Sequence, residues 1–534
     1  MSLQQLSTEL DTLICEHCDT STLLSLCATS QYWRTLAEPI LYEAVCFTVD
    51  EVREVKILLI TLIERPDLAK YVRKIRIAPS WPATHPTGPS SSSQIYQDQG
   101  LLEWTAEGSV GDKDGANGLD DPDFLFAEEQ KSARIENNFR ALTPRMAQII
   151  ESAWPKVSGH TKKHLWIAGL NTSYYETADP YLPLIVTLTT NVEELDLQYP
   201  RDGSANFTNM ILHYHRTAHE VACGNPYPFH KLRDLQIQGT FHSQDSGHTM
   251  SLWAPLPVST ESLVIRDYEI DHFEYAQPRE VSELPSTKSA GSSVGVIPKA
   301  IRAGFGSKLR ILDMRRCYIA VPDLVCSLRN ENFCNLETLR ITKLSHAHRW
   351  LNMPWALFGG VLRSCLPKLQ ELELSMWWDQ PGQPSALSGP VASVQTIRGL
   401  QTLPNLRILN INLGLLMYSF AGDAANELLT LPCTVVPEDL EYLELTDVPL
   451  QFLDEIVHEN AATKRRNVLA QLLLALPHCH WLLLQTYRMP SAEVLNGLQA
   501  IRNSLAEMNV EFKVSCCCPP DEAAHVDGEK LVLI

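Results

Sequence analysis

The chain has 534 residues, of which 45% are hydrophobic and 8% aromatic, and its formal net charge at pH 7 is −19. This composition excludes a wholly disordered chain, and the length exceeds what one ordinary globular core accommodates. An acidic surface repels phosphate backbones, so we expect no nucleic-acid partner. The one compact basic run, Lys464-Arg465-Arg466, is interpreted as a solvated helix end.

The sequence also bears on the compartment. Residues 1–14 lack the basic stretch and apolar core of a secretory signal, and no uncharged apolar run reaches the length of a membrane span. Fourteen cysteines without an export signal favour a reducing compartment with free thiols. We therefore expect an intracellular protein, cytoplasmic or nuclear, with no membrane partner.

Residues 1–46 predict three short helices. Ser7, Asp19 and Ser30 are suitable N-caps, and Pro39 is expected to end or kink the third helix. Apolar residues at helical spacing accompany each cap: Leu6, Leu10, Leu13 and Ile14 around Ser7, then Leu23 and Leu24, then Trp33. Because so small a unit buries little surface, these side chains are available to a partner or to the next domain.

Three segments of this module carry a resemblance to a known family. They are Leu6-Ser7-Thr8-Glu9-Leu10 with Leu13-Ile14, then Asp19-Thr20-Ser21-Thr22-Leu23-Leu24-Ser25-Leu26, then Ser30-Gln31-Tyr32-Trp33-Arg34. In this order they resemble the three helices of an F-box. Ser7 stands where that family usually has proline, and a serine there can still cap the helix.

The resemblance implies a function. F-box modules dock the Skp adaptor of cullin–RING (SCF-type) ubiquitin ligases, and the repeats behind them select the substrate. Docking is then helix-in-groove recognition by apolar anchors. The residues implied in adaptor binding are Leu6, Leu10, Leu13, Ile14, Leu23, Leu24 and Trp33. The alternative is that these seven side chains pack against the first repeat.

Residues 47–70 predict a linker helix, and residues 71–77 predict the first strand of a long second domain at 71–515. Three stretches rich in proline, glycine, serine or acidic residues, at 79–130, 277–298 and 379–393, are predicted to be disordered insertions. Residues 516–534 are taken as a C-terminal tail.

The second domain is organised by segments of the form Leu-x-x-Leu-x-Leu. They end at Leu197, Ile237, Met314, Ile341, Leu374, Ile411 and Leu445, with looser copies at Leu165-Ile167, Leu263-Ile265, Leu482-Leu484 and Phe512-Val514. Alternate apolar residues predict a strand with one buried face, and units of this kind must stack to close a core. The segments resemble degenerate leucine-rich repeats. The resemblance implies an α/β solenoid, with a curved parallel sheet and outer helices, preceded by the small all-α F-box.

The residues between and after each apolar pair point away from the core. They are polar, and we predict that they bind a substrate protein: Asp196, Gln198, Gln236, Gln238, Arg340, Thr342, Glu373, Ser375, Asn410 and Asn412, with Glu444 and Thr446 in the same pattern. Trp377 and Trp378, just past a strand, are further candidates. Ordinary solvated alternation of polar residues is the alternative.

No catalytic motif stands out. His213, His215, His219 and Cys223 were weighed as a metal site, and Cys479 between two histidines as a nucleophile, but neither set has a second matching group. We expect no cofactor, no metal and no enzymatic activity. Two other hypotheses stay open: a leucine-rich-repeat scaffold unconnected to a ligase, whose head only covers the first repeat, and a metalloenzyme built on His215 and His219.

Overall fold

The computed structural model describes part of the chain. The described residues are 7–48, 51–78, 181–198, 230–238, 259–266, 308–315, 333–344, 355–376, 399–416, 436–448, 450–462, 476–486, 489–516 and 531–532, with a few single residues between them. The chain forms two compact units, Met1–Ser246 with Ala254–Thr260, and Gly247–Trp253 with Glu261–Ile534. The predicted insertions at 79–130, 277–298 and 379–393 lie outside the described residues.

The first unit begins with a helical head. Its helices are α1 (Thr8–Glu16), α2 (Thr20–Thr29) and α3 (Gln31–Leu41), as the sequence predicts. Cys15, Leu23, Ala37 and Leu41 form its buried core. Asp19 caps α2 by accepting a hydrogen bond from the Thr22 amide at 2.7 Å, and Ser30 caps α3 through the Trp33 amide at 3.2 Å.

Two local details of the head add to these expectations. Ser7 occupies the N-cap of α1 with an extended backbone, but within the described head its hydroxyl makes no capping hydrogen bond. Pro39 does not end α3, which continues to Leu41. Proline removes only its own amide donor, and the Tyr42 amide still reaches the Glu38 carbonyl at 3.0 Å.

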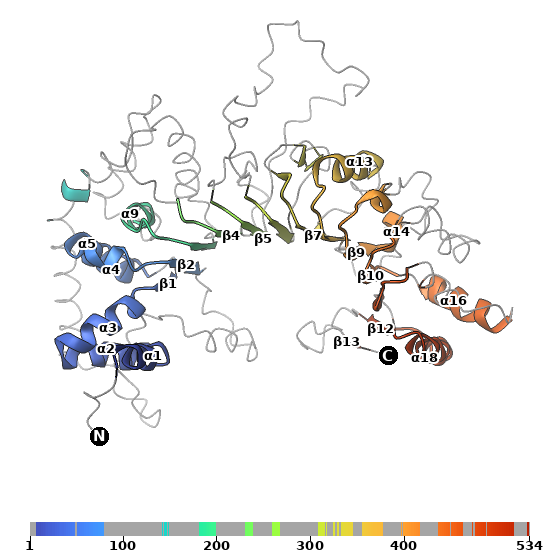
Figure 1. Ribbon diagram of the computed structural model, residues 1–534, viewed down its shortest axis with the longest axis horizontal. Helices are drawn as coiled ribbons and strands as arrows, with labels where there is room; N and C mark the ends of the chain where they lie inside the picture. The colour runs from blue at the N-terminus through green and yellow to red at the C-terminus, as the bar shows by residue number, and fades with distance from the viewer. Residues whose placement is uncertain are drawn as a thin grey trace, which may run out of the picture. The chain divides into compact units, whose positions relative to one another are not determined.

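A parallel sheet follows the head in the same unit (Figure 1). Its strands are β1 (Ala44–Thr48), β2 (Lys74–Ala78), β3 (Glu194–Gln198) and β4 (Asp234–Gln238), each paired with the next. Helices α4 (Val52–Glu64) and α5 (Pro66–Ala69) lie between β1 and β2, and α9 (Leu182–Leu188) precedes β3.

The start of the sheet differs from the prediction. Residues 71–77 were expected to supply the first strand, but β1 precedes β2 and pairs with it from Ala44 opposite Lys74 onward. Parallel strands need a crossover of a dozen or more residues, and α4 with α5 provides it. The predicted linker helix is therefore a crossover, and only Tyr42 and Glu43 separate the head from the sheet.

The second unit repeats the same arrangement. Its parallel strands are β5 (Ser262–Arg266), β6 (Ile311–Arg315), β7 (Thr338–Leu344), β8 (Glu371–Met376), β9 (Ile408–Asn412), β10 (Tyr442–Thr446), β11 (Trp481–Thr486) and β12 (Glu511–Cys516). A short β13 (Leu531–Val532) in the expected tail pairs antiparallel with β12. The intervening segments include α13 (Trp355–Cys365), η5 (Leu400–Thr402), α14 (Leu413–Leu416), α16 (Leu450–Ala462) and α18 (Ala492–Ala506).

Every apolar repeat segment that the structure describes forms a strand, and only the looser copy at 165–167 lies outside the described residues. The two apolar side chains of each pair are buried, for example Leu372 and Leu374 in β8. Both units are thus α/β, with parallel strands that follow one another in chain order. This order sets polar residues of successive strands side by side on the opposite face.

Candidate functional site

The helical head presents an apolar surface to solvent. Its residues are 40% to 49% exposed, namely Leu10, Leu13 and Ile14 of α1, Leu24 of α2 and Tyr32 of α3. We call this set the apolar head surface. Leu10, Leu13 and Ile14 follow one another at the spacing of one helix face. Exposed large apolar side chains on neighbouring helices are candidates for an interaction site.

Asp11 and Tyr32 fix the geometry of this surface. The Tyr32 hydroxyl donates a hydrogen bond of 2.5 Å to Asp11 Oδ2, which joins α3 to α1, and this bond raises the pKa of Tyr32. Asp11 is buried in α1. The Tyr32 ring also meets the edge of Trp33, with centroids 5.5 Å apart. The Asp11–Tyr32 hydrogen bond therefore joins α1 to α3, the two helices that carry most of the apolar head surface, and Tyr32 also packs against Trp33.

The head residues predicted from the sequence divide into three groups. Leu10, Leu13, Ile14 and Leu24 are exposed, as docking requires. Leu23 is only 4% exposed and belongs to the head core, so the expectation that it contacts the adaptor is corrected. Consecutive side chains on a helix point about 100° apart, so only one of Leu23 and Leu24 can face outward. Trp33 packs partly buried against the core, and Leu6 lies outside the described residues.

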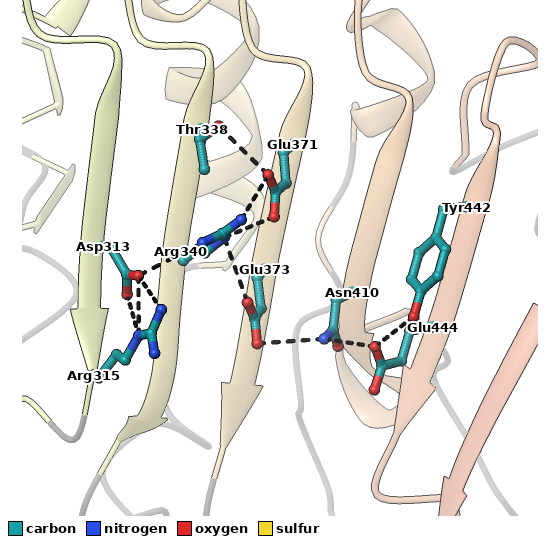
Figure 2. A network of polar contacts seen from close by, with 9 residues as sticks. All are labelled: Asp313, Arg315, Thr338, Arg340, Glu371, Glu373, Asn410, Tyr442 and Glu444. Atoms are coloured by element: carbon teal, nitrogen blue, oxygen red, sulfur yellow. Dashed lines mark hydrogen bonds and ion pairs between the residues drawn. The ribbon is translucent and has the colours of Figure 1, made fainter. Parts of the chain in front are cut away.

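The second candidate surface is the polar face of the sheet in the second unit. The residues between the paired apolar side chains lie in register across five strands, from β6 to β10: Asp313, Arg340, Glu373, Asn410 and Glu444. Figure 2 shows these residues with Arg315, Thr338, Glu371 and Tyr442, and we call the nine the strand-face network.

Two arginines dominate one end of this network. Arg315 donates to Asp313 of its own strand, with Nη2 2.6 Å from Oδ2, and Asp313 is 2% exposed. Arg340 donates to Glu371 through Nε at 2.7 Å and Nη2 at 3.1 Å, a two-point contact that raises the pKa of Arg340. Arg340 also lies 3.8 Å from Asp313. At this end of the network, each guanidinium group forms an ion pair with at least one carboxylate.

The other end carries two carboxylates joined by an amide (Figure 2). Asn410 Nδ2 donates to Glu373 Oε1 at 3.3 Å and to Glu444 Oε2 at 3.0 Å. The Tyr442 hydroxyl also donates to Glu444 Oε2, at 3.0 Å. Burial and the nearby Glu444 raise the pKa of Glu373, in opposition to Arg340. We call Glu373, Asn410 and Glu444 the acidic triplet.

The remaining predicted substrate-binding residues are more dispersed. Thr342 and Ser375 are paired across β7 and β8 and are half-buried. Asn412 is fully buried and donates to Asp447 at 3.1 Å, so its expected contact with a substrate is corrected. In the first unit Asp196 pairs with Gln236, and Gln198 with Gln238. Trp377 and Trp378 lie outside the described residues.

Several members of the strand-face network were not predicted from the sequence. Asp313 and Arg315 occupy the same positions of their repeat as Arg340 and Thr342, so applying one rule to every repeat would have found them. Glu371 comes directly before the apolar pair of β8, and Tyr442 directly before that of β10, so both side chains lie on the polar face. Beyond Tyr442 the face continues with Trp481, whose ring stacks on that of Tyr442 at 5.9 Å, and Lys513 Nζ lies 4.1 Å from the Trp481 ring centroid.

The structure also bears on the residues considered as metal ligands or as a nucleophile. His213, His215, His219 and Cys223 lie outside the described residues, within which no group of three His, Cys, Asp or Glu side chains is placed to hold a metal ion. Cys479 is buried, and burial raises the pKa of its thiol to about 11, so it stays protonated at neutral pH. Among the helices of the described ranges, none has both the length and the apolar character to cross a lipid bilayer.

No model of a known protein family matches the chain, and no curated protein matches it significantly. The fold and the two surfaces define the class: an α/β protein of parallel strands in chain order, with a three-helix head that exposes apolar side chains and a sheet whose face opposite the apolar pairs carries buried and half-buried charged residues.

Proposed function

We propose that this chain is the substrate-recognition subunit of a cullin–RING (SCF-type) ubiquitin ligase. The head acts as an F-box that docks the Skp adaptor, and the strands form a leucine-rich-repeat solenoid whose polar face binds the target protein. The chain performs no chemistry itself. It raises the rate of ubiquitin transfer by holding target and conjugating enzyme close together.

The apolar head surface is the observation that carries this proposal. Four of the seven residues that the F-box resemblance implies in docking are exposed, and Tyr32 extends the surface they form. Burying a half-exposed leucine against a groove contributes about 1 kcal/mol, so these side chains can act as the apolar anchors of a larger docking interface. The direct connection of α3 to β1 supports a rigid subunit that holds its target at a set distance.

A reconstitution with purified components tests the proposal. The full chain mixed with the purified Skp adaptor is expected to elute from a sizing column as one complex. Leu10→Asp with Leu13→Asp should abolish this complex, because two charges would enter an apolar groove. Leu357→Asp is the matched control, since Leu357 is an exposed leucine on α13 of the second unit, and it should leave the complex intact.

Two results would contradict the proposal. One is the absence of any complex with the wild-type chain, which favours the alternative of a repeat scaffold unconnected to a ligase. The other is equal adaptor binding by the wild-type chain and the double variant, with circular dichroism confirming that both are folded.

A further inference from the structure

The helical head holds three cysteines at one core. Cys15 is fully buried within that core, and Cys18 and Cys27 pack partly buried against it. All three are free thiols. Cys15 and Cys18 also have the Cys-x-x-Cys spacing that is typical of dithiol redox motifs. The apolar head surface uses none of these thiols, so their grouping calls for a separate explanation.

The end of α1 brings the side chains of Cys15 and Cys18 together. The His17 amide donates to the Ile14 carbonyl at 3.2 Å, and the Cys18 amide donates to the Cys15 carbonyl at 3.0 Å. Bonds between residues three apart form a 3₁₀ turn, in which side chains three residues apart lie one above the other. Such a turn keeps the two Cα atoms within about 7 Å, and a disulfide joins Cα atoms about 4.4–6.8 Å apart. The backbone therefore suits a disulfide between Cys15 and Cys18.

The surroundings of the two thiols give them different reactivities. Burial raises the pKa of the Cys15 thiol, and the neighbouring Cys18, Asp11 and Cys27 raise it further. A buried, protonated thiol reacts slowly with an oxidant. Cys18 is half-buried, and its Sγ donates to the Ile14 carbonyl at 3.2 Å, on the outer side of the core. An oxidant therefore reaches Cys18 first, and Cys15 is the thiol that lies ready to complete a disulfide.

The same turn carries part of the apolar head surface. Leu13 is 49% exposed and Ile14 is 40% exposed, and the Ile14 carbonyl accepts hydrogen bonds from both the His17 amide and the Cys18 thiol. A disulfide draws its two sulfur atoms from non-bonded contact to about 2.05 Å. It also removes the thiol hydrogen that Ile14 accepts. Closing the disulfide therefore shifts the turn that holds Leu13 and Ile14.

We propose that Cys15 and Cys18 form a reversible disulfide that weakens docking by the apolar head surface. The disulfide itself stands apart from the proposed function, whereas its effect on docking rests on that function. The oxidant is a hydroperoxide, for which hydrogen peroxide is the simplest probe.

The reaction proceeds in two steps. The Cys18 thiolate attacks one peroxide oxygen, the O–O bond breaks, and the departing hydroxide takes up a proton to leave as water, so that Cys18 becomes a sulfenic acid. The Cys15 sulfur then attacks the sulfenic sulfur, the S–O bond breaks, and the Cys15 proton leaves with the oxygen as a second water. Two thiols lose two electrons and two protons, and one hydrogen peroxide is reduced to two waters. An added dithiol reverses the change by thiol–disulfide exchange.

Peptide mapping of the full chain locates the disulfide. The chain is treated with hydrogen peroxide, unfolded in urea with iodoacetamide, reduced, and labelled again with N-ethylmaleimide. Trypsin then releases residues 1–34 as one peptide, because Arg34 is the first basic residue, and this peptide contains all three head cysteines. Fragmentation is expected to find maleimide on Cys15 and Cys18 and the iodoacetamide label on Cys27. Treatment with dithiothreitol before labelling should leave all three with the iodoacetamide label.

Two matched variants connect the disulfide to docking. Peroxide should weaken binding of the wild-type chain to the purified Skp adaptor about fivefold or more, and dithiothreitol should restore it. Cys18→Ser should bind the adaptor equally with and without peroxide. Cys27→Ser removes the other half-buried thiol of the head and should keep both the disulfide and the loss of binding. Circular dichroism of each variant establishes that it is folded.

Several results would overturn the proposal. They are a peroxide-treated peptide without a disulfide, a disulfide that includes Cys27, or equal adaptor binding by the reduced and oxidised wild-type chains. If the wild-type chain binds no adaptor in either state, the ligase proposal fails, and the peptide map still decides whether Cys15 and Cys18 form the disulfide. Adaptor binding by a chain whose Cys15 and Cys18 stay reduced would contradict only the redox proposal.

Discussion

Arg65 forms a two-point ion pair with Glu38, in which Nη1 lies 3.0 Å from Oε1 and Nη2 lies 3.0 Å from Oε2. The same guanidinium contacts Asp67 at 2.8 Å and holds the pKa of that carboxyl below its usual range. Glu38 belongs to α3, and Asp67 to α5 in the first crossover. Arg65 therefore fastens the helical head to the first repeat.

Replacing Arg65 with Met is expected to lower the free energy of unfolding by about 1 kcal/mol or less, because the pair is partly exposed and screened by water. Urea denaturation of the wild-type chain and Arg65→Met measures the difference. At 1 M NaCl the difference should shrink, since salt screens exposed charges. A loss of the same size at high salt would assign the effect to packing of the arginine stem instead.

Gly497 allows α18 to pack closely on α16. A Cβ at this position would lie 2.2 Å from Val457 Cγ1 and 2.9 Å from Cγ2. Alanine favours a helix by about 1 kcal/mol over glycine, but overpacking against a stiff valine costs about 1–3 kcal/mol. Gly497→Ala should therefore lower the thermal midpoint.

Gly360 in α13 is the matched control for that prediction. Apart from its two chain neighbours and the nearby backbone of its own helix, no atom in the described part of the chain lies within 4 Å of a Cβ placed there. Gly360→Ala should raise the thermal midpoint, through helix propensity alone. If both substitutions stabilise the protein equally, the close packing of α16 and α18 is not present in solution.

Glu373→Gln is expected to stabilise the fold at neutral pH. Burial and Glu444 raise the pKa of Glu373 in the native state, with Asp313, Glu371 and Arg340 as the other charged neighbours. The native state therefore binds more protons than the unfolded state, whose glutamates titrate near about 4.3. Wild-type stability from this group then falls as pH rises above that value through the native pKa.

Urea midpoints of both proteins from pH 4 to pH 8 measure this effect. The variant should match the wild type near pH 4 and exceed it at pH 7, where the wild-type carboxylate is charged. A variant that is less stable than the wild type at pH 7 would mean that the carboxylate stabilises the native state.

Thiol labelling distinguishes the buried from the exposed cysteines. Cys334 is exposed, whereas Cys479 is buried and its pKa is raised to about 11. Since the thiolate is the reactive form, Cys479 should react with iodoacetamide at pH 7.5 about a hundredfold more slowly than an ordinary thiol. Mass spectrometry of the labelled peptides measures both rates, and similar rates at Cys334 and Cys479 would show that the segment just before β11 opens readily.

The repeats were predictable from the sequence because buried strands with one apolar face leave a simple trace. Leu372 and Leu374 are two residues apart, as only a strand requires, and the same pair recurs along the chain. β1 was harder to recognise, since Val45 and Phe47 are its only buried apolar residues and no leucine pattern precedes them. Its place in the sheet depends on pairing with β2, which is a tertiary contact.

The charged face was only partly predictable. The alternation placed Arg340, Glu373 and Asn410 on one face, but which of them touch depends on the register between strands. The burial of Asn412 and Thr446 could not be predicted from the alternation of apolar and polar residues, because that pattern does not distinguish buried from exposed positions on the polar face. In the head, Leu23 and Leu24 are equally apolar, and only the packing of α2 against α3 decides which one is exposed.

Hydrogen exchange of the full chain with and without the Skp adaptor tests the central claim most directly. We predict slower exchange in α1 and α2, around Leu13 and Leu24, and unchanged exchange in β6 to β10, which we propose bind the target protein. Unchanged exchange in α1 and α2 at saturating adaptor, or protection confined to the strands, would contradict the account.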